Sequence, residues 1–371
     1  HLREVFMDVR ELRIGFRVLD LANLRGWACF RCQGVLGGFH LCLLRLKIIN
    51  CLRLFQMIRK LFLPRLCLDS ELKGIKGTLL DDGWILHEID SDCDVFDSDT
   101  GVKIMSLRKR RLIGSQDQMK NFKKMAKASR GRKVAAGPID PESLYWKDKT
   151  LINTKGSSTG YLKPDGTPSK MLVANNVFST QIGYYNQLTH LGRNLPCRLT
   201  YFTNAHLTQY IDSLSYIEQI GTWYKRMWKD AYDHQMDRAM ERPKWKIGDT
   251  PFSTITVNRT FRTALHQDTG DYGGVACMSV LEYGEYQGGL FMIPAYGIGV
   301  DLREGDVLVA NVHQYHCNSQ IWTTPEQDQR NALLPRLLKD NLKIGTLGAG
   351  TDYARISMVC YLREKMIDCP I

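Results

Sequence analysis

The C-terminal third of the chain consists of short β-strand patterns separated by turns. Residues 252 to 364 contain FSTITVNRTFRTAL, VACMSVLEY, GGLFMIPAYGIGVDL, DVLVANVHQYH and ARISMVCYLRE in succession, with Gly, Asp and Asn turns between them. The stretch before them, TQYIDSLSYIEQIGTWYKRMWKDAYDHQMDRAM, has apolar residues at helical spacing, which predicts one long helix or two in succession. We therefore expect an α+β protein in which helices cover a β-sandwich or barrel.

Composition divides the 371 residues into three regions. Residues 1–70 are rich in Leu, Arg and Cys, poor in acids and begin at His1, so we interpret them as an atypical segment, either a fragment or a wrongly predicted gene start. Residues 71–150 read as short strands around Asp and Gly turns, followed by a basic arm. Residues 151–371 form the third region and contain the β-rich third.

The charge is strongly positive. Lys and Arg number 50 against 39 Asp and Glu, which gives a net charge of +11 and favours polyanionic partners such as nucleic acid. The cations concentrate in a run whose single acid is Asp117. Its members are Lys103, Arg108, Lys109, Arg110, Arg111, Lys120, Lys123, Lys124, Lys127, Arg130, Arg132 and Lys133. This run is either a cationic arm that neutralises DNA phosphates or an ordinary solvated face.

The eleven cysteines have no disulfide-framework spacing and lie in apolar runs, which favours a reduced intracellular protein. Cys29 and Cys32 form a lone CxxC without the second pair that a zinc site needs. The stretch LCLLRLKIINCLRLFQMIRKLFL carries a cation every few positions, which argues against a membrane-spanning helix. It is either a helix packed on its own domain or an amphipathic helix on a membrane surface.

The stretch ALHQDTGD carries a candidate metal site. His266 and Asp268 are two residues apart, so on an extended strand both side chains point to the same face. Two histidines and one carboxylate hold Fe(II) on one side and leave three coordination positions open. The third ligand comes from VANVHQYHCNSQI; we prefer His316 at the end of a strand pattern, with His313 as the alternative.

A candidate clamp for a carboxylate lies on a later strand. In YARISMVCYLRE, alternation places Arg355, Ser357, Val359, Tyr361 and Arg363 on one face. A guanidinium fork beside a hydroxyl suits the distal carboxylate of 2-oxoglutarate, so we assign Arg355 and Ser357 to co-substrate binding.

The strand before the metal ligands supplies further candidates. Parity with His266 places Asn258, Thr260, Arg262 and Ala264 toward the inside of the barrel. Small Ala264 leaves room beside the metal. Asn258 and Arg262 either line the substrate or co-substrate pocket or satisfy backbone groups inside the barrel.

Three segments together resemble the ten-eleven translocation and base-J binding protein (TET/JBP) dioxygenases, particularly their fungal, algal and viral members. These segments are TVNRTFRTALHQDTGD, GGLFMIPAYGIGVDLREGDVLVANVHQYHCN and RISMVCYLREKM, within residues 250–366. The resemblance implies that residues 151–371 are a dioxygenase domain with a double-stranded β-helix (jelly-roll or cupin-like) core at about 250–366. It implies an enzyme that uses Fe(II), 2-oxoglutarate and O2 to oxidise the methyl group of a base in DNA.

The resemblance also assigns roles to residues. His266, Asp268 and His316 match the catalytic iron ligands, and Arg355 and Ser357 match the co-substrate clamp. Asp271 matches the position that touches the flipped base, and Tyr361 matches the aromatic ring against that base. Such a base must leave the duplex, because stacking hides its methyl group from a pocket. Oxidising an inert methyl group calls for a metal-bound oxidant.

Two departures from the family bear on the substrate. Arg363 stands where some cytosine-oxidising relatives have a histidine, which leaves the identity of the base open: 5-methylcytosine is favoured and thymine is the alternative. The interval between His316 and Arg355 is longer than in the family, and its TTPEQDQRNALLPRLLKDNLKIGTLGAGTDY is expected to be an inserted lid or a DNA-facing loop.

Two other readings stay open. The same iron chemistry serves a protein prolyl or lysyl hydroxylase, and a metal-free β-barrel that binds nucleic acid is the non-enzyme reading. For the base dioxygenase we expect an intracellular protein, with a nuclear location consistent with its substrate, no membrane partner and no obligate protein partner.

Overall fold

The computed structural model describes residues 58–112, 131–134, 150–153, 159–169, 175–190, 193–334, 346–347 and 353–371. Residues 58–371 form one compact unit. The expected boundary near residue 70 therefore differs from the structure, because β1 (Arg59–Leu63) already belongs to the main sheet of this unit. Residues 29 and 32, the arm residues 113–130 and most of the apolar N-terminal stretch lie outside the described residues.

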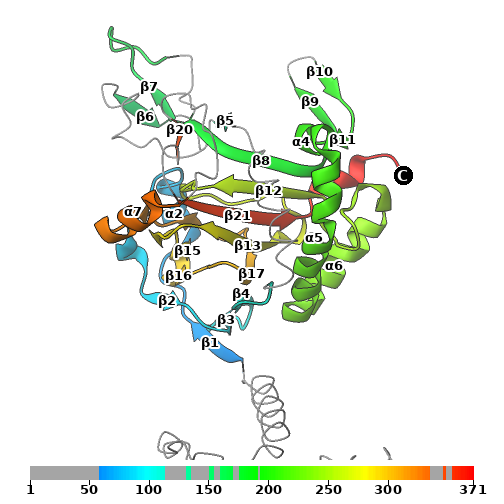
Figure 1. Cartoon of the computed structure of the whole chain (residues 1–371), viewed down its shortest axis with the longest axis horizontal. Helices are drawn as coiled ribbons and strands as arrows, with labels where there is room; N and C mark the ends of the chain where they lie inside the picture. Colours follow the sequence, from blue (N-terminus) through cyan, green and yellow to red (C-terminus); the bar gives the residue numbers. More distant parts are fainter. Residues whose placement is uncertain are drawn as a thin grey trace, which may run out of the picture. The chain divides into compact units, whose positions relative to one another are not determined.

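The main sheet joins strands from both ends of the unit (Figure 1). Its order is β1, β3 (Cys93–Asp97), β4 (Lys103–Arg108), β17 (Val307–Asn311), β13 (Val275–Tyr283), β21 (Ala354–Tyr361), β12 (Thr254–Arg259), β8 (Asn175–Tyr185) and β11 (Arg198–Leu199). The short strands β5 (Gly131–Val134) and β20 (Thr346–Leu347) also pair with β8. Because β4 pairs with β17, the region 71–150 does not fold apart from the β-rich third.

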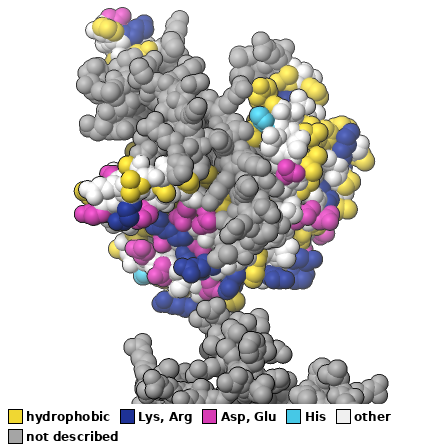
Figure 2. All heavy atoms as spheres, viewed as in Figure 1, with side chains coloured by type: hydrophobic (Ala, Val, Ile, Leu, Met, Phe, Trp, Pro, Cys, Tyr) yellow, Lys and Arg dark blue, Asp and Glu magenta, His cyan; other side chains and the backbone are white. Residues whose placement is uncertain are grey.

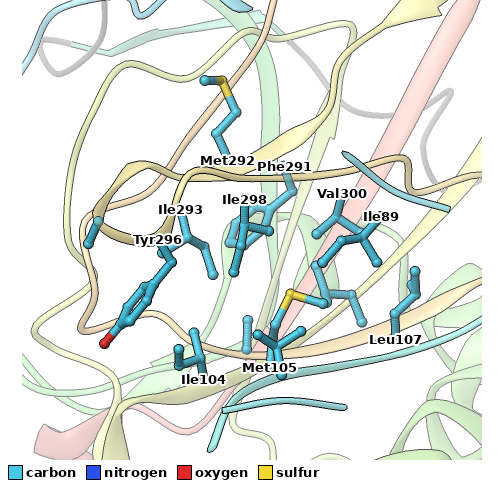
Figure 3. Close-up of a cluster of buried hydrophobic side chains, with 14 of the residues drawn as sticks. Ile89, Ile104, Met105, Leu107, Phe291, Met292, Ile293, Tyr296, Ile298 and Val300 are labelled. Atoms are coloured by element: carbon cyan, nitrogen blue, oxygen red, sulfur yellow. The ribbon is translucent and has the colours of Figure 1, made fainter. Parts of the chain in front are cut away.

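A smaller sheet packs on one face of the main sheet. It contains β18 (Cys317–Asn318), β15 (Phe291–Ile293), β16 (Ile298–Val300) and β2 (His87–Ile89). Buried side chains from both sheets form one core, in which Ile298 and Val300 lie over Met105 and Leu107 (Figure 3). Two sheets that enclose a common apolar interior form the predicted double-stranded β-helix.

Helices cover the opposite face of the main sheet. The predicted helical stretch forms two successive helices, α5 (Leu207–Met227) and α6 (Lys229–Met240), which lie beside the main sheet in Figure 1. Ile217, Ile220 and Tyr224 of α5 pack into one cluster with Ile255 and Met358 of the sheet. This burial leaves the other face of β12 and β21 for the interior of the barrel.

The remaining elements are short. They are α2 (Asp69–Gly74), α4 (Tyr201–Ala205), α7 (Pro325–Ala332), the 3₁₀ helices η3 (Asp82–Trp84), η4 (Pro243–Trp245), η5 (Tyr272–Gly274), η6 (Pro294–Tyr296) and η7 (Glu364–Asp368), and the paired strands β6 (Leu151–Asn153) with β7 (Thr159–Tyr161), β9 (Leu188–His190) with β10 (Arg193–Leu195), and β14 (Gln287–Gly288) with β19 (Ile321–Trp322). Among the described residues, no helix is long and apolar enough to cross a lipid bilayer.

The first part of the interval between His316 and Arg355 forms a helix that packs on the barrel. Its helix α7 has a capping box at Thr324, and Arg330 forms two hydrogen bonds of 2.7 Å with the carboxylate of Glu285. Asn331 accepts from the backbone N–H of Glu285 and donates to its carbonyl. The helix is thus fixed on the barrel, and the lid or DNA-facing role expected for the rest of the interval falls on residues outside the described ones.

The first residues of the basic run do not form a free cationic arm. Lys103 and Arg108 pair with Asp94, Lys109 pairs with Asp306, and Arg111 pairs with Asp92. Arg108 is almost fully buried, and its guanidinium also donates to two backbone carbonyls. Figure 2 shows Lys and Arg beside Asp and Glu over the lower part of the visible face. These four cations are therefore engaged in ion pairs within the fold.

One expectation about cysteines is also corrected. Cys197 and Cys369 are joined in a disulfide, although all cysteines were expected to be reduced. The two lie 172 residues apart, so no local spacing announces the bond. Cys67, Cys93, Cys277, Cys317 and Cys360 are free, and all except Cys67 are buried.

Candidate metal and co-substrate site

Backbone pairing brings the three predicted metal ligands together. His266 and His316 form an antiparallel bridge with N–O distances of 3.0 and 2.9 Å, and Asp268 N donates to the carbonyl of Val312 at 3.0 Å. One ligand atom from each of His266, Asp268 and His316 lies within 4.8 Å of the others. This cluster has the composition of a facial triad for Fe(II).

A hydrogen bond at Nδ1 orients each of the two imidazoles. His266 Nδ1 lies 2.7 Å from the carbonyl of Ala264, and His316 Nδ1 lies 2.9 Å from the carbonyl of Gln314. A backbone carbonyl can only accept, so each Nδ1 carries the proton and each Nε2 keeps its lone pair. Both Nε2 atoms lie toward Asp268, at 3.8 Å from Oδ1 for His266 and 3.5 Å from Oδ2 for His316.

Electrostatics favour the ligand forms of two of these side chains. Burial, and then the neighbouring His316, lower the pKa of His266 to about 4, so this imidazole is neutral near pH 7. Burial opposes ionisation of Asp268, but its interactions with His316 and His266 outweigh burial and lower the pKa of the carboxyl to about 2. A neutral imidazole and an ionised carboxylate are the forms that bind metal.

The alternative ligand His313 is turned away from this cluster. Its Nε2 lies 3.0 Å from the carbonyl of Asp271, and its ring packs against Gly274, where a Cβ would come within 2.8 Å. Gly274 has a φ of +67°, which glycine adopts without strain. Of the two candidates, the structure brings His316 to His266 and Asp268.

The triad opens into a cavity of about 500 Å³, a size that accepts small molecules. The alternation expected for β21 is confirmed: Arg355, Ser357, Val359, Tyr361 and Arg363 all line this cavity. Between them, Ile356, Met358 and Cys360 face the helices. One strand thus carries a row of side chains past the metal ligands, roughly 20 Å long from residue 355 to 361 at 3.3 Å per residue.

Arg355 fits a carboxylate clamp. Its side chain is 4% exposed, and its Nε has no hydrogen-bond partner among the described residues. The neighbouring Gly289 has a φ of +70°, and a Cβ there would come within 3.1 Å of Arg355 Cδ. A buried guanidinium N–H without a partner is costly unless a ligand accepts from it. Ser357, two residues further along β21, lines the same cavity.

Asp271, Tyr361 and Arg363 meet at the other end of the row. Asp271 and Arg363 form a backbone bridge, and Arg363 donates from Nε to Thr254 Oγ1 at 3.0 Å and from a terminal nitrogen to Tyr361 Oη at 3.2 Å. Burial and the charge of Asp268 raise the pKa of Asp271 to about 8, with Arg363 opposing. The end of the cavity away from Arg355 therefore offers a phenol ring, a fixed guanidinium and a carboxyl.

The alternation of inward-facing side chains that we expected before the triad does not hold throughout. β12 ends at Arg259, and Thr260 has a φ of +46°, a left-handed conformation that interrupts alternation. Asn258 and Ala264 line the cavity as expected, but Arg262 does not; its guanidinium donates to the carbonyls of Leu80 and Asn318. The pocket role of Arg262 is therefore corrected in favour of the alternative, backbone satisfaction.

Other lining residues escaped the sequence analysis. Gln181 of β8 lines the cavity, donates to Tyr361 Oη at 3.4 Å and accepts from Tyr185 Oη at 2.6 Å. The alternation of Ser179 and Gln181 in NNVFSTQIGYY is the signal that marks this strand, and both residues line the cavity. Lys76 also lines it, and no motif surrounds that residue.

Comparison with known proteins adds the family. Residues 181–364 match Tet_JBP, described as the oxygenase domain of the 2OGFeDO superfamily. Residues 181–364 thus form a Tet_JBP oxygenase domain, which accounts for 184 of the 371 residues. The match begins in β8 and ends at Glu364, so it covers every candidate ligand and clamp residue of the Tet_JBP site.

Curated relatives of this chain include thymine dioxygenases. It is 35% identical over 144 residues to thymine dioxygenase JBP1 of Trypanosoma brucei brucei, covering 38% of this chain and 16% of the relative. It is 30% identical over 236 residues to the bifunctional helicase and thymine dioxygenase JBP2 of Leishmania tarentolae, covering 63% of this chain and 17% of the relative. The chain thus spans less than a fifth of the length of these relatives.

Solved structures of low sequence identity also resemble the chain. NgTET1 in complex with 5mC DNA has 11% identity and a TM-score of 0.42, covering 76% of this chain and 80% of that one. A 2OG-Fe(II) oxygenase family oxidoreductase from Burkholderia pseudomallei has 9% identity and a TM-score of 0.33, covering 70% and 86%.

Proposed function

We propose that this protein is an Fe(II)- and 2-oxoglutarate-dependent dioxygenase that oxidises the methyl group of a pyrimidine base in DNA. The observation that supports it is one cavity holding His266, Asp268 and His316 together with a buried, unpartnered Arg355 Nε. With 2-oxoglutarate and O2, bound Fe(II) supplies the oxidising power that an unactivated methyl group requires. The side chains of the cavity hold, orient and shield the reactants.

In this proposal, the cavity divides between its two ligands. Arg355 and Ser357 bind the distal carboxylate of 2-oxoglutarate through charge-assisted hydrogen bonds. The extruded base enters the opposite end, where Tyr361 offers its ring and Asp271 and Arg363 offer polar groups to the base edge. Asn258 of β12 pairs with Ser357 of β21 and Ser179 of β8, so its amide lies beside the co-substrate clamp.

The first candidate base is 5-methylcytosine. Its exocyclic amine donates and its ring N3 accepts, which suits the carboxyl group of Asp271 beside the donor-only guanidinium of Arg363. The second candidate is thymine, and the observation in its favour is that the curated relatives are thymine dioxygenases. Thymine presents O4 as an acceptor, which Arg363 also suits.

Nucleoside mass spectrometry after reaction tests the function and the base together. The protein is incubated with Fe(II), 2-oxoglutarate, O2 and one of three duplexes of identical sequence. These contain 5-methylcytosine with uracil in place of thymine, thymine with unmodified cytosine, or neither methylated base. We expect the hydroxymethylated nucleoside of 5-methylcytosine from the first duplex and a matching release of succinate.

Each other outcome is informative. Product from the thymine duplex alone would assign the base to thymine. Succinate release driven by proline- or lysine-containing peptides, without any modified nucleoside, would replace the proposal with a protein hydroxylase. If neither wild type nor Asp268→Ala takes up Fe(II), the non-enzyme reading of a nucleic-acid-binding barrel replaces it. A nuclear location is part of the proposal, because an enzyme of DNA bases works where DNA is kept.

A further inference from the structure

Lys76 lines the cavity although it lies outside the segment that matches the family. It follows α2, and backbone hydrogen bonds join the next two residues, Gly77 and Thr78, to Leu265. Gly77 N donates to the carbonyl of Leu265 at 2.9 Å, and Leu265 N donates to the carbonyl of Thr78 at 2.9 Å. This pairing fixes Lys76 beside His266, with which it interacts electrostatically.

The charge of Lys76 has no acidic partner among the described residues. The other cations that line the cavity, apart from the histidines, are Arg355 and Arg363. Arg363 donates to Thr254 and Tyr361, and Arg355 is the candidate co-substrate clamp. A half-buried ammonium beside an imidazole favours an anion brought by a ligand.

The position of Lys76 indicates which anion. Thr260 N donates to the carbonyl of Arg355 at 2.7 Å, so the clamp lies at the Thr260 end of the segment leading to the triad. Lys76 lies at its His266 end, because Gly77 N donates to the carbonyl of Leu265, and the cavity lining continues from His266 to the exposed residues Thr269 and Gly270. A base extruded into the cavity leaves its phosphates at the rim.

We propose that Lys76 binds a backbone phosphate next to the extruded nucleotide. The inference rests on the proposed function, because it requires DNA as the ligand. An ammonium on a flexible stem suits this contact, since it can follow a phosphate oxygen without a fixed geometry. The N-terminal part of the unit would thus contribute to substrate binding as well as to the barrel.

DNA binding measured by fluorescence anisotropy at several salt concentrations tests the inference. The full chain, with Fe(II) replaced by Zn²⁺ to prevent turnover, is titrated with a duplex carrying 5-methylcytosine and thymine. We expect Lys76→Met to weaken binding about tenfold at low salt and to reduce the slope of log K against log salt by about 0.9. Lys76→Arg should keep the slope, and Lys73→Met, an exposed lysine of α2 that does not line the cavity, should behave as wild type.

A neutral methylphosphonate beside the target base locates the contact. It should weaken wild type and leave Lys76→Met without further loss, because partners in one contact are not additive. Equal slopes for wild type and Lys76→Met, or a raised KM for 2-oxoglutarate with unchanged DNA affinity, would overturn the inference. The nucleoside assay reports separately on the proposed function, while a wild type that does not bind DNA would overturn both.

Discussion

The side chain of Arg355 is almost inaccessible to water. The guanidinium is buried on β21, and no acid among the described residues forms a salt bridge with it. We expect Arg355→Lys to keep the charge but lose the planar fork, and so to weaken 2-oxoglutarate binding about tenfold or more. Calorimetric titration of the Fe(II)-loaded protein without oxygen measures this.

Arg330→Lys is the matched control for that variant. Arg330 is an exposed arginine paired with Glu285, and it does not line the cavity. Its replacement should leave 2-oxoglutarate affinity unchanged. Unaltered affinity in Arg355→Lys would mean that the co-substrate carboxylate is held elsewhere.

Residue patterns predicted much of the site, and local backbone conformation decided where they failed. Alternation correctly placed four side chains of β21 in the cavity, because that strand is regular from Ala354 to Tyr361, and it also held for Arg363, two residues beyond the strand. The same reasoning failed for Arg262, since the left-handed Thr260 lies between it and β12. Lys76 could not be found from sequence, because its place depends on a pairing with residues almost 190 positions away.

At the scale of elements, Gly183 controls how β8 passes β12. Its φ is +92°, and a Cβ there would lie 2.4 Å from the carbonyl oxygen of Ser253 and 2.6 Å from Ile247 Cδ1. Gly183→Ala therefore combines backbone strain with a clash, and we expect it to lower the free energy of unfolding by about 3 kcal/mol or more. Urea unfolding followed by circular dichroism measures the loss.

Gly101→Ala separates the two causes. Gly101 has a φ of +69°, but a Cβ there would meet nothing within 4 Å. Backbone strain alone should cost about 1 kcal/mol. If both variants lost the same free energy of unfolding, the clash with Ser253 and Ile247 would make no contribution.

The turn between β3 and β4 depends on an ionised Asp97. Its carboxylate accepts from the backbone N–H and the hydroxyl of Thr100 and from the Tyr296 hydroxyl, which lower its pKa to about 2. The folded protein therefore binds this proton more weakly than the unfolded chain, whose carboxyl has an ordinary pKa of about 4. The stabilisation is complete above pH about 4 and is lost as the pH falls toward about 2.

Asp97→Asn should consequently lower stability at neutral pH and lose less stability than wild type on acidification. Urea midpoints at pH about 7, about 4 and about 3 compare the two proteins across the window set by these pKa values. Asp99→Asn is the control, because Asp99 is exposed in the same turn and, within the part of the chain that the structure describes, its carboxylate accepts only from Ser98. A constant difference between Asp97→Asn and wild type over this range would contradict the assignment.

At the scale of the whole molecule, the sequence patterns predicted the class of fold but not which N-terminal strands complete the two sheets. The β-rich third and the two helices were recognisable from periodicity, whereas β1, β3 and β4 join the main sheet and β2 joins the smaller one through long-range pairing. The basic run illustrates the limit of composition. Lys109 is neutralised by Asp306, nearly 200 residues away, and only folding brings that acid to it.

The disulfide between Cys197 and Cys369 ties the segment before β11 to the C-terminal segment after η7. Arg242 Nε and the Trp245 indole N–H also bind this C-terminal segment, at the carbonyls of Cys369 and Pro370. Because the bond closes a loop of 172 residues, it limits the freedom of the unfolded chain far more than a local bond would. We expect dithiothreitol to lower the free energy of unfolding by about 2–4 kcal/mol.

Urea unfolding with and without dithiothreitol measures this contribution. Cys197→Ser/Cys369→Ser should match reduced wild type and should not respond to dithiothreitol, whereas Cys67→Ser, which removes a free thiol, should respond as wild type does. Wild-type midpoints that are equal with and without reductant would mean that the two thiols are not joined in solution. That result would restore the reduced state expected from the cysteine pattern, and the hydrogen bonds from Arg242 and Trp245 would then hold the C-terminal segment alone.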